Sequence, residues 1–298
     1  MRKKLTAVLL AATMLLTSGV TVFADRVDAV IDKPYLALGA DLSPQEQMKV
    51  LSLLGLSDIN VDDYDIISIT NADEHEYLDK YLDASIIGTR ALSSVLVVGK
   101  EAGNGIHVTT KNISYCTEGM YRNALLTAGI EDADITVAGP FSISGTAALV
   151  GAIKAYETMT GEEIDDENLD AANDELVLTG KLVEDIGDSE KAEDLMALVK
   201  QEVAENKLTS AEDIQNVVDQ ACEQLDIQLS KENQQQIAKL MKKIEGLDLD
   251  VDKLKDQAKD LYQKLENLDF HVDKESVGNF FTRIIDAIVK FFQGLFGK

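Results

Sequence analysis

Hydrophobic and polar residues alternate in short blocks through the first half of the chain, and this pattern predicts strands and helices in turn. Runs rich in β-branched and aliphatic residues predict strands. Stretches whose apolar residues recur every three or four positions predict helices with one buried face. The predicted strands are 33–42, 64–70, 92–100, 105–113 and 132–140, and the predicted helices are 43–56, 71–82, 117–130 and 144–159.

Local signals add detail to these elements. Ser43 is suited to cap the first helix, with Pro44 in its first turn and Glu46 completing a capping box. The strands 92–100 and 105–113 are joined by "EAGN", which is typical of a hairpin. From 64 to 139 the order is strand, helix, strand, strand, helix, strand, and this order predicts a ferredoxin-like (split βαβ) domain.

The pattern changes near residue 160, after which there are no prolines and the apolar residues follow helical spacing. Amphipathic helices are predicted at 210–225, 230–247 and 250–268. Such helices pack as a bundle, and a coiled coil that binds a partner is the alternative. The predicted fold class is α+β, with an α/β domain at 25–160 followed by an all-α helical bundle region at 161–273.

The last segment, 274–298, is predicted to be an amphipathic C-terminal helix. Arg283, Lys290 and Lys298 against Asp286 give residues 279–298 a side-chain charge of +2. This composition is typical of a helix that lies in a membrane surface, and docking to an envelope partner or sealing of the chain's own bundle are the alternatives. Its apolar arc includes Phe280, Phe281, Ile284, Ile285, Ile288, Phe291, Phe292, Leu295 and Phe296.

Residues 1–24 have the pattern of a signal peptide. Three positive residues precede the short apolar run 5–16, and "VFA" at 22–24 forms a cleavage site before Asp25. An uncleaved anchor is the alternative, although the run is shorter than the ~20 residues of a membrane span. We therefore expect an exported chain that is extracellular or associated with the cell envelope.

Charge and cysteine content exclude some function classes. Cleavage after Ala24 would leave 25 basic against 53 acidic residues, a formal charge of −28. Nucleic-acid binding needs a basic surface, so we expect no nucleic-acid partner. Cys116 and Cys222 lie far apart in the sequence, and we expect two buried thiols, with a disulfide as the alternative. The oligomeric state is left open.

The best candidate for a binding site is the segment "ITVAGPFSISGTAAL" at 135–149. A predicted strand ends at Pro140, a loop carries Ser142 and Ser144, and a helix starts at Gly145 and Thr146. Free N–H groups at such a helix start can bind an anion or a peptide carboxylate. An exported hydrolase with Ser142 or Ser144 as nucleophile near His107 is the alternative, although the G-x-S-x-G pattern is missing. In the simplest interpretation, Ser144 only caps the helix.

Other motifs point to no chemistry. "HEYLD" at 75–79 lacks the second histidine of a zinc-protease helix. The acidic run from Asp248 lacks the glycine and terminal glutamate of a calcium loop. No phosphate loop, dinucleotide fingerprint or redox cysteine pair is present, so we predict no metal, no cofactor and no catalytic residues. We expect a non-enzymatic protein.

Three stretches resemble the YpuA-like family, secreted proteins of Gram-positive bacteria that are built on a domain of unknown function. They are "LGADLSPQEQMKVLSLLG" near the start, "NISYCTEGMYRNALLTAGIEDADITVAGPFSISGTAALVGAIKAYE" in the middle and "LSKENQQQIAKLMKKIEGLDLDVDKL" later. The resemblance covers nearly the whole mature chain, and the middle stretch is its most specific part. It implies an exported, envelope-associated protein with no assigned reaction.

Overall fold

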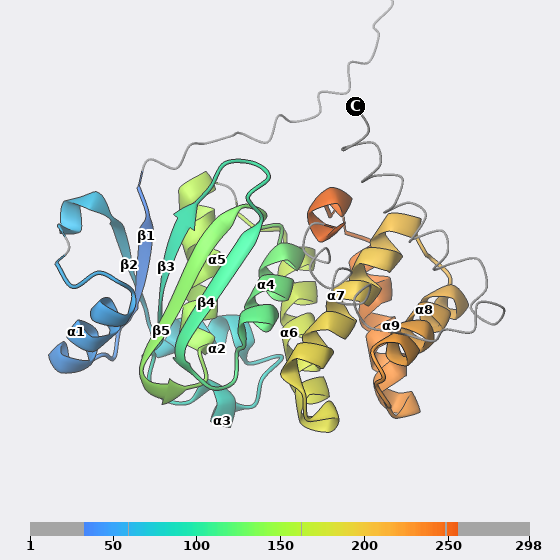
Figure 1. The fold of residues 1–298 in the computed structure, drawn as a ribbon. Coiled ribbons are helices and arrows are strands. Elements are labelled where there is room, and N and C mark those ends of the chain that lie inside the picture. The colour runs from blue at the N-terminus through green and yellow to red at the C-terminus, as the bar shows by residue number, and fades with distance from the viewer. Residues whose placement is uncertain (1–32, 59, 162, 248, 256–298) are drawn as a thin grey trace, which may run out of the picture.

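A computed structural model of the chain describes residues 33–58, 60–161, 163–247 and 249–255 (Figure 1). The predicted signal peptide at 1–24 and the predicted C-terminal helix at 274–298 lie outside the described residues. The described part is α+β, with one sheet in the first half and helices after it. Among its helices, none combines the length and the apolar composition needed to cross a membrane.

Five strands form one mixed sheet in the order β2-β1-β3-β5-β4 (Figure 1). β1 pairs with β2 and β4 pairs with β5 in parallel, whereas β3 pairs antiparallel with β1 and with β5. Each strand lies within or close to a predicted one. The bounds are β1 Tyr35–Gly39, β2 Asp65–Ile69, β3 Ser94–Gly99, β4 Ile106–Ile113 and β5 Ala133–Ile143.

The predicted hairpin of 92–100 with 105–113 is wrong, because β5 lies between β3 and β4. The reason is burial. Ile135 and Val137 of β5 are fully covered, so β5 takes an interior position in the sheet. Exposed Thr109 and Lys111 alternate with more covered residues along β4, which suits an edge strand. Since the ferredoxin-like prediction required that hairpin, and β1 separates β2 from β3, the split-βαβ topology is not confirmed.

Six predicted helices are present with bounds close to those expected, namely those at 43–56, 71–82, 117–130, 144–159, 210–225 and 230–247. The helices at 84–87, 166–186 and 189–206 were not predicted, and most of the predicted helix at 250–268 lies outside the described residues. Ser43 and Glu46 form the predicted capping box, in which Ser43 N donates to Glu46 Oε2 at 2.7 Å. Ser210 and Ser230 accept bonds from backbone N–H groups as the caps of two later helices. The helices are α1 Pro44–Leu53, α2 Asn71–Leu78, α3 Ala84–Ile87, α4 Glu118–Thr127, α5 Thr146–Thr160, α6 Asp166–Ile186, α7 Ser189–Asn206, α8 Ala211–Gln224 and α9 Lys231–Glu245, and η1 Val61–Asp63 is a short 3₁₀ helix.

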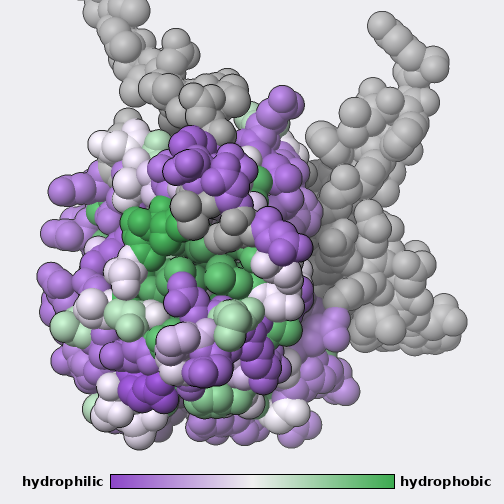
Figure 2. Space-filling model, turned by 90° about the vertical axis from the view of Figure 1, so that its left-hand side faces the viewer, coloured by the Kyte–Doolittle hydropathy of each residue, from purple (hydrophilic) through white to green (hydrophobic). Residues whose placement is uncertain are grey.

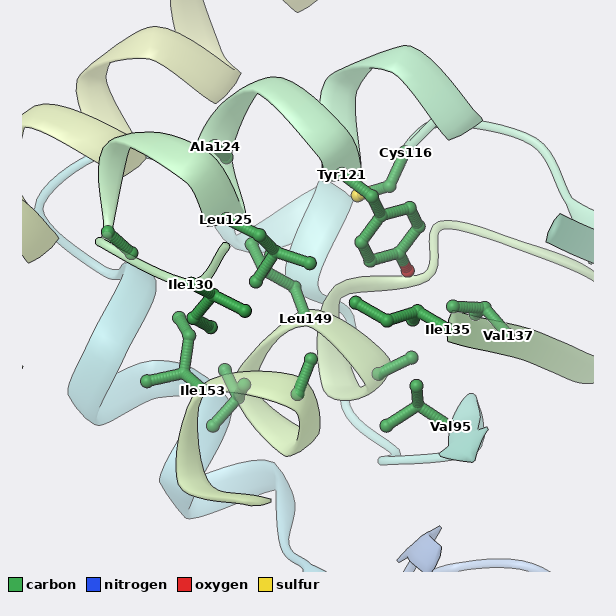
Figure 3. Packing of buried hydrophobic residues seen from close by; sticks show 14 of the residues in the cluster. Val95, Cys116, Tyr121, Ala124, Leu125, Ile130, Ile135, Val137, Leu149 and Ile153 are labelled. Carbon is green, nitrogen blue, oxygen red and sulfur yellow. The ribbon is translucent and has the colours of Figure 1, made fainter. Parts of the chain in front are cut away.

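Helix α5 covers one face of the sheet. Leu149 and Ile153 on α5 pack with Ile135 of β5 and Leu125 of α4 in the largest core cluster (Figure 3). Gly151 lets α5 approach β1 closely, because a Cβ there would lie 2.8 Å from the Cβ of Ala37. On the opposite face, α1 packs through Val50 and Leu54 against Leu36 of β1.

The helices α6 to α9 form a second core, and α6 belongs to both cores. Leu178 and Leu182 of α6 pack with α7, α8 and α9, while Leu176 packs into the core under the sheet. Cys116 and Cys222 are both buried and unpaired, so the expectation of two buried thiols is confirmed. The two halves of the chain therefore share α6 and have no disulfide between them.

Buried polar side chains join α4, α6 and α7 where the two cores meet. Lys200 of α7 and Glu175 of α6 are both fully buried, with Nζ 3.0 Å from Oε1. Lys200 Nζ also donates to the carbonyl oxygen of Asn123 at 2.9 Å and to Thr127 Oγ1 at 3.1 Å, both on α4. Thr127 Oγ1 in turn donates to Glu175 Oε2. Burial lowers the pKa of Lys200, and the adjacent Glu175 carboxylate opposes this shift.

We expect Lys200→Met to lower the free energy of unfolding by about 3–5 kcal/mol, because it leaves Glu175 buried without its cation. Lys200→Met combined with Glu175→Leu should cost less than the sum of the two single changes, since no unpaired charge remains. Urea unfolding measures these values.

The control is Lys242→Met. Lys242 forms a 3.4 Å pair with Glu245, and its side chain is 48% exposed. This change should cost less than about 1 kcal/mol. A loss at Lys200 no larger than that at Lys242 would contradict the prediction.

Candidate functional site

The predicted loop connects β5 to α5, but β5 ends three residues later than predicted. β5 continues past Pro140 to Ile143, so Ser142 lies in the strand, where it is exposed beside Phe141. Proline is tolerated because the pairing with β3 ends at Ala138, so no ladder hydrogen bond is lost at position 140. Ser144 follows the strand and is half-buried.

Gly145 caps α5, and the prediction that Ser144 does so is wrong. Gly145 has φ +100°, a left-handed conformation that favours glycine. Its carbonyl oxygen accepts a 2.6 Å bond from the Tyr121 hydroxyl, which points at this connection from α4 (Figure 3). The Ser144 carbonyl accepts a 2.9 Å bond from Cys116 N. Ser93 Oγ accepts from Ala148 N at 2.9 Å, so a distant serine supplies the side-chain acceptor.

Glu74 of α2 reaches the same helix start. Its side chain is buried at 1% exposure, and Oε1 accepts a 2.7 Å bond from Thr146 Oγ1. Oε2 accepts a 3.2 Å bond from Asn71 Nδ2. Burial raises the pKa of Glu74, and these two hydrogen bonds oppose the rise. A carboxyl group of the protein therefore binds the Thr146 hydroxyl, and the anion or peptide site at this helix start stays a prediction.

Two further reactive groups border this cluster, and both are held in their neutral form. Burial raises the pKa of the Cys116 thiol to about 12. Burial also raises the pKa of the Tyr121 hydroxyl well above its usual range. Nucleophilic attack by cysteine requires the thiolate. Cys116 therefore acts here as a small apolar residue of the core.

The serines and His107 are not brought together. His107 pairs in register with Asp134 near the start of β5, while Ser142 lies eight residues further along that strand. At ~3.3 Å per residue this is about 26 Å, and a general base must approach to about 3 Å. His107 Nδ1 lies 3.4 Å from Asp134 Oδ1 on an exposed surface. The structure thus provides no Ser–His pair of the predicted kind.

The zinc-like motif forms a pair inside one helix. His75 Nδ1 lies 2.6 Å from Asp79 Oδ1, and the hydrogen bond that His75 donates to the Asp79 carboxylate raises the pKa of His75. In the described ranges, no three His, Cys, Asp or Glu side chains gather closely enough to hold a metal ion.

The candidate site is a hydrogen-bonded cluster at the start of α5. It consists of Ser144, Gly145, Thr146, Glu74 and Tyr121.

Sequence reasoning missed Glu74, Tyr121 and Ser93. Glu74 lies in the first turn of α2, where the helix dipole alone favours an acidic residue. One signal could have found it, since Glu74 is four residues before the buried Leu78 and so lies on the same face of α2. Ser93, which lies 55 residues before its partner Ala148, has no such local signal.

We expect Gly145→Ala to destabilise the fold more than Gly161→Ala, by at least about 1 kcal/mol. Both positions have positive φ, so both substitutions carry conformational strain. Only at Gly145 would the new Cβ also collide, 2.7 Å from Tyr121 Oη and 2.8 Å from Ile113 Cγ2. Thermal and urea unfolding measure the difference. Equal losses in the free energy of unfolding would show that the surrounding side chains move aside for the new Cβ without cost.

We expect Glu74 to make stability fall as the pH rises. Its pKa is raised in the folded chain above the ordinary 4.5, so the folded state holds this proton longer than the unfolded state. The free energy of unfolding of the native chain, relative to Glu74→Gln, should decline as the pH rises from 4.5 through the folded-state value. Urea unfolding of both proteins across this range measures it, and a difference independent of pH would contradict it.

Comparison with known proteins identifies the family. Residues 38–261 match the family model described as "Protein of unknown function (DUF1002)". The chain is 38% identical over 296 residues to "Uncharacterized protein YpuA" of Bacillus subtilis (strain 168), an alignment that covers 98% of this chain and all of that protein. No solved structure matches. The resemblance inferred from the sequence is confirmed, and the chain belongs to the DUF1002 family of proteins of unknown function.

Proposed function

We propose that this chain is an exported, envelope-associated, non-enzymatic protein that docks through its C-terminal segment to a membrane surface or to an envelope partner. One observation carries the proposal. Residues 279–298 have a broad apolar arc and a charge of +2, in a chain whose overall formal charge is −25. An apolar face beside cationic side chains is the composition of an interfacial helix.

The buried state of the candidate site favours a non-enzymatic role. A catalytic acid or nucleophile must meet its substrate, and enzymes place such groups in accessible pockets. Glu74 and Thr146 are each 1% exposed, and Cys116 and Tyr121 are fully buried. Their hydrogen bonds are made within the protein. This argues against these four groups as catalysts in the alternative function, an exported hydrolase that uses the Ser142/Ser144 loop.

The export part of the proposal rests on residues 1–24. Their positive start, apolar run and small-residue cleavage site form the pattern that directs a chain across the membrane. The remaining chain is strongly acidic, and repulsion between like charges disfavours association of its copies with one another. The role of the last segment is then to hold an otherwise free chain at the envelope.

We expect deletion of residues 278–298 to release the exported chain from the envelope fraction, because the apolar arc is removed. Immunoblots of envelope and medium fractions measure the distribution. A matched control replaces the polar residues Thr282 and Gln293 by Ser, which leaves the arc intact and should leave the chain in place. Retention of the deleted chain at the level of the control would contradict docking by this segment.

Vesicle flotation separates the two docking modes. Binding of the intact chain to vesicles of anionic phospholipid assigns the docking to lipid. Envelope retention without vesicle binding assigns it to a protein partner that receives the helix in a groove.

A further inference from the structure

The sheet face opposite α5 is only partly covered. A row of directly paired residues crosses it from β2 to β4 in the order Ile66, Leu36, Leu96, Thr136 and Thr109. Directly paired residues point to the same face. Leu36 is fully buried beneath α1, whereas Ile66 is 42% exposed. The row is thus apolar at the β2 edge and polar at the β4 edge.

Further apolar side chains lie on the same face as Ile66. Leu38 of β1, Leu51 of α1 and Tyr64 are only partly buried where they pack on the small core beneath α1. We call these three residues with Ile66 the β2–α1 patch. Figure 2 looks at this side of the molecule and shows hydrophobic residues gathered at its centre with hydrophilic ones around them. Exposed apolar surface of this kind marks an interaction site.

The border of the patch is acidic. Asp58, Asp62 and Asp63 precede β2, and all three are exposed. Lys33 is the basic residue beside them, and its Nζ donates to the carbonyl oxygen of Asp62 at 2.7 Å. The border therefore carries a net negative charge and favours an occupant that is apolar with cationic flanks.

This charge argues against two occupants. A second copy paired edge to edge through β2 would bring both sets of aspartates together, and acidic side chains on an edge strand oppose such pairing. An anionic lipid surface would be repelled for the same reason. The chain's own residues 279–298 carry an apolar arc with Arg283, Lys290 and Lys298, which is the complementary chemistry.

The segment is long enough to reach the patch. The described chain ends at Lys255, and Lys253 forms an ion pair with Asp132, directly before β5. Three strand spacings separate β5 from β2, which is about 14 Å. The 24 residues from 256 to 279 would span about 27 Å as a flexible coil, and about 36 Å if all of them were helical. The connection therefore permits contact without strain.

We propose that the β2–α1 patch is the docking site of the chain's own C-terminal segment. The apolar arc around Ile288 then packs on Ile66, and the cationic residues lie beside the aspartates. The proposal rests on the docking function proposed above, and it adds a second binding site, within the chain itself, for the same segment. The seated helix covers its phenylalanines while the chain is free. Docking at the envelope then requires the helix to leave the patch, so the two contacts exclude each other.

Disulfide trapping tests this docking site in the exported chain, residues 25–298. The pair Ile66→Cys and Ile288→Cys should cross-link under mild oxidation with about ten-fold higher yield than two control pairs, because a seated helix raises the local concentration. One control keeps Ile288→Cys and moves the other cysteine to Thr109, in the same row about 19 Å away. The other keeps Ile66→Cys and uses Asp286→Cys on the polar side of the helix. Cys116 and Cys222 are buried and remain in all chains.

Hydrogen exchange gives a second measurement without new cysteines. Deletion of residues 278–298 should speed exchange in α1 and β2 and leave β4 unchanged. Equal cross-linking yields in all pairs, or unchanged hydrogen exchange in α1 and β2, would contradict docking of the C-terminal segment on the β2–α1 patch. Release of the deleted chain from the envelope would still support the proposed function, so the two proposals fail separately.

Discussion

A buried lysine at the junction of the two cores is the constraint on which the arrangement of this protein depends. An ammonium group without water must have all its protons accepted, or its burial costs several kcal/mol. Lys200 comes from α7, its carboxylate partner from α6, and its other two acceptors from α4. These three helices can therefore meet in only a narrow range of positions. Apolar packing between the same helices would tolerate sliding, because it has little directional preference.

The same principle explains the start of α5. A helix start leaves backbone N–H groups without partners inside the helix. Here the Ser93 hydroxyl supplies one such partner by accepting from Ala148 N, and in the same turn the Glu74 carboxyl accepts from the Thr146 hydroxyl. These two hydrogen bonds fix α2 and β3 against α5. The polar residues Glu74 and Ser93 therefore have a structural role at this helix start.

The sequence predicted the local features of the fold well. Strand positions and the capping box of Ser43 depend on residues within a few positions of one another, and such signals are present in the sequence itself. The order of strands in the sheet also depends on contacts between residues that are distant in sequence. Ala138 of β5, for example, packs in the core beneath α1. The hairpin prediction used only neighbouring residues and failed for that reason.

The candidate site shows the same division. The loop with Ser144, Gly145 and Thr146 could be located because a strand pattern passes into a helix pattern there. Glu74 could not be assigned to it, because 72 residues separate Glu74 from Thr146. The end of β5 was also placed too early, since Pro140 was taken as a stop although the partner strand β3 no longer needs a bond there.

The two buried thiols have a consequence for how the chain matures. Thiol–disulfide exchange requires an accessible thiolate, and burial raises the pKa of Cys116 to about 12 and that of Cys222 to about 11. The native fold therefore forms no covalent cross-link and offers no thiolate to an oxidant. No oxidant or oxidoreductase is therefore required to complete this fold, because both thiols remain unpaired in it.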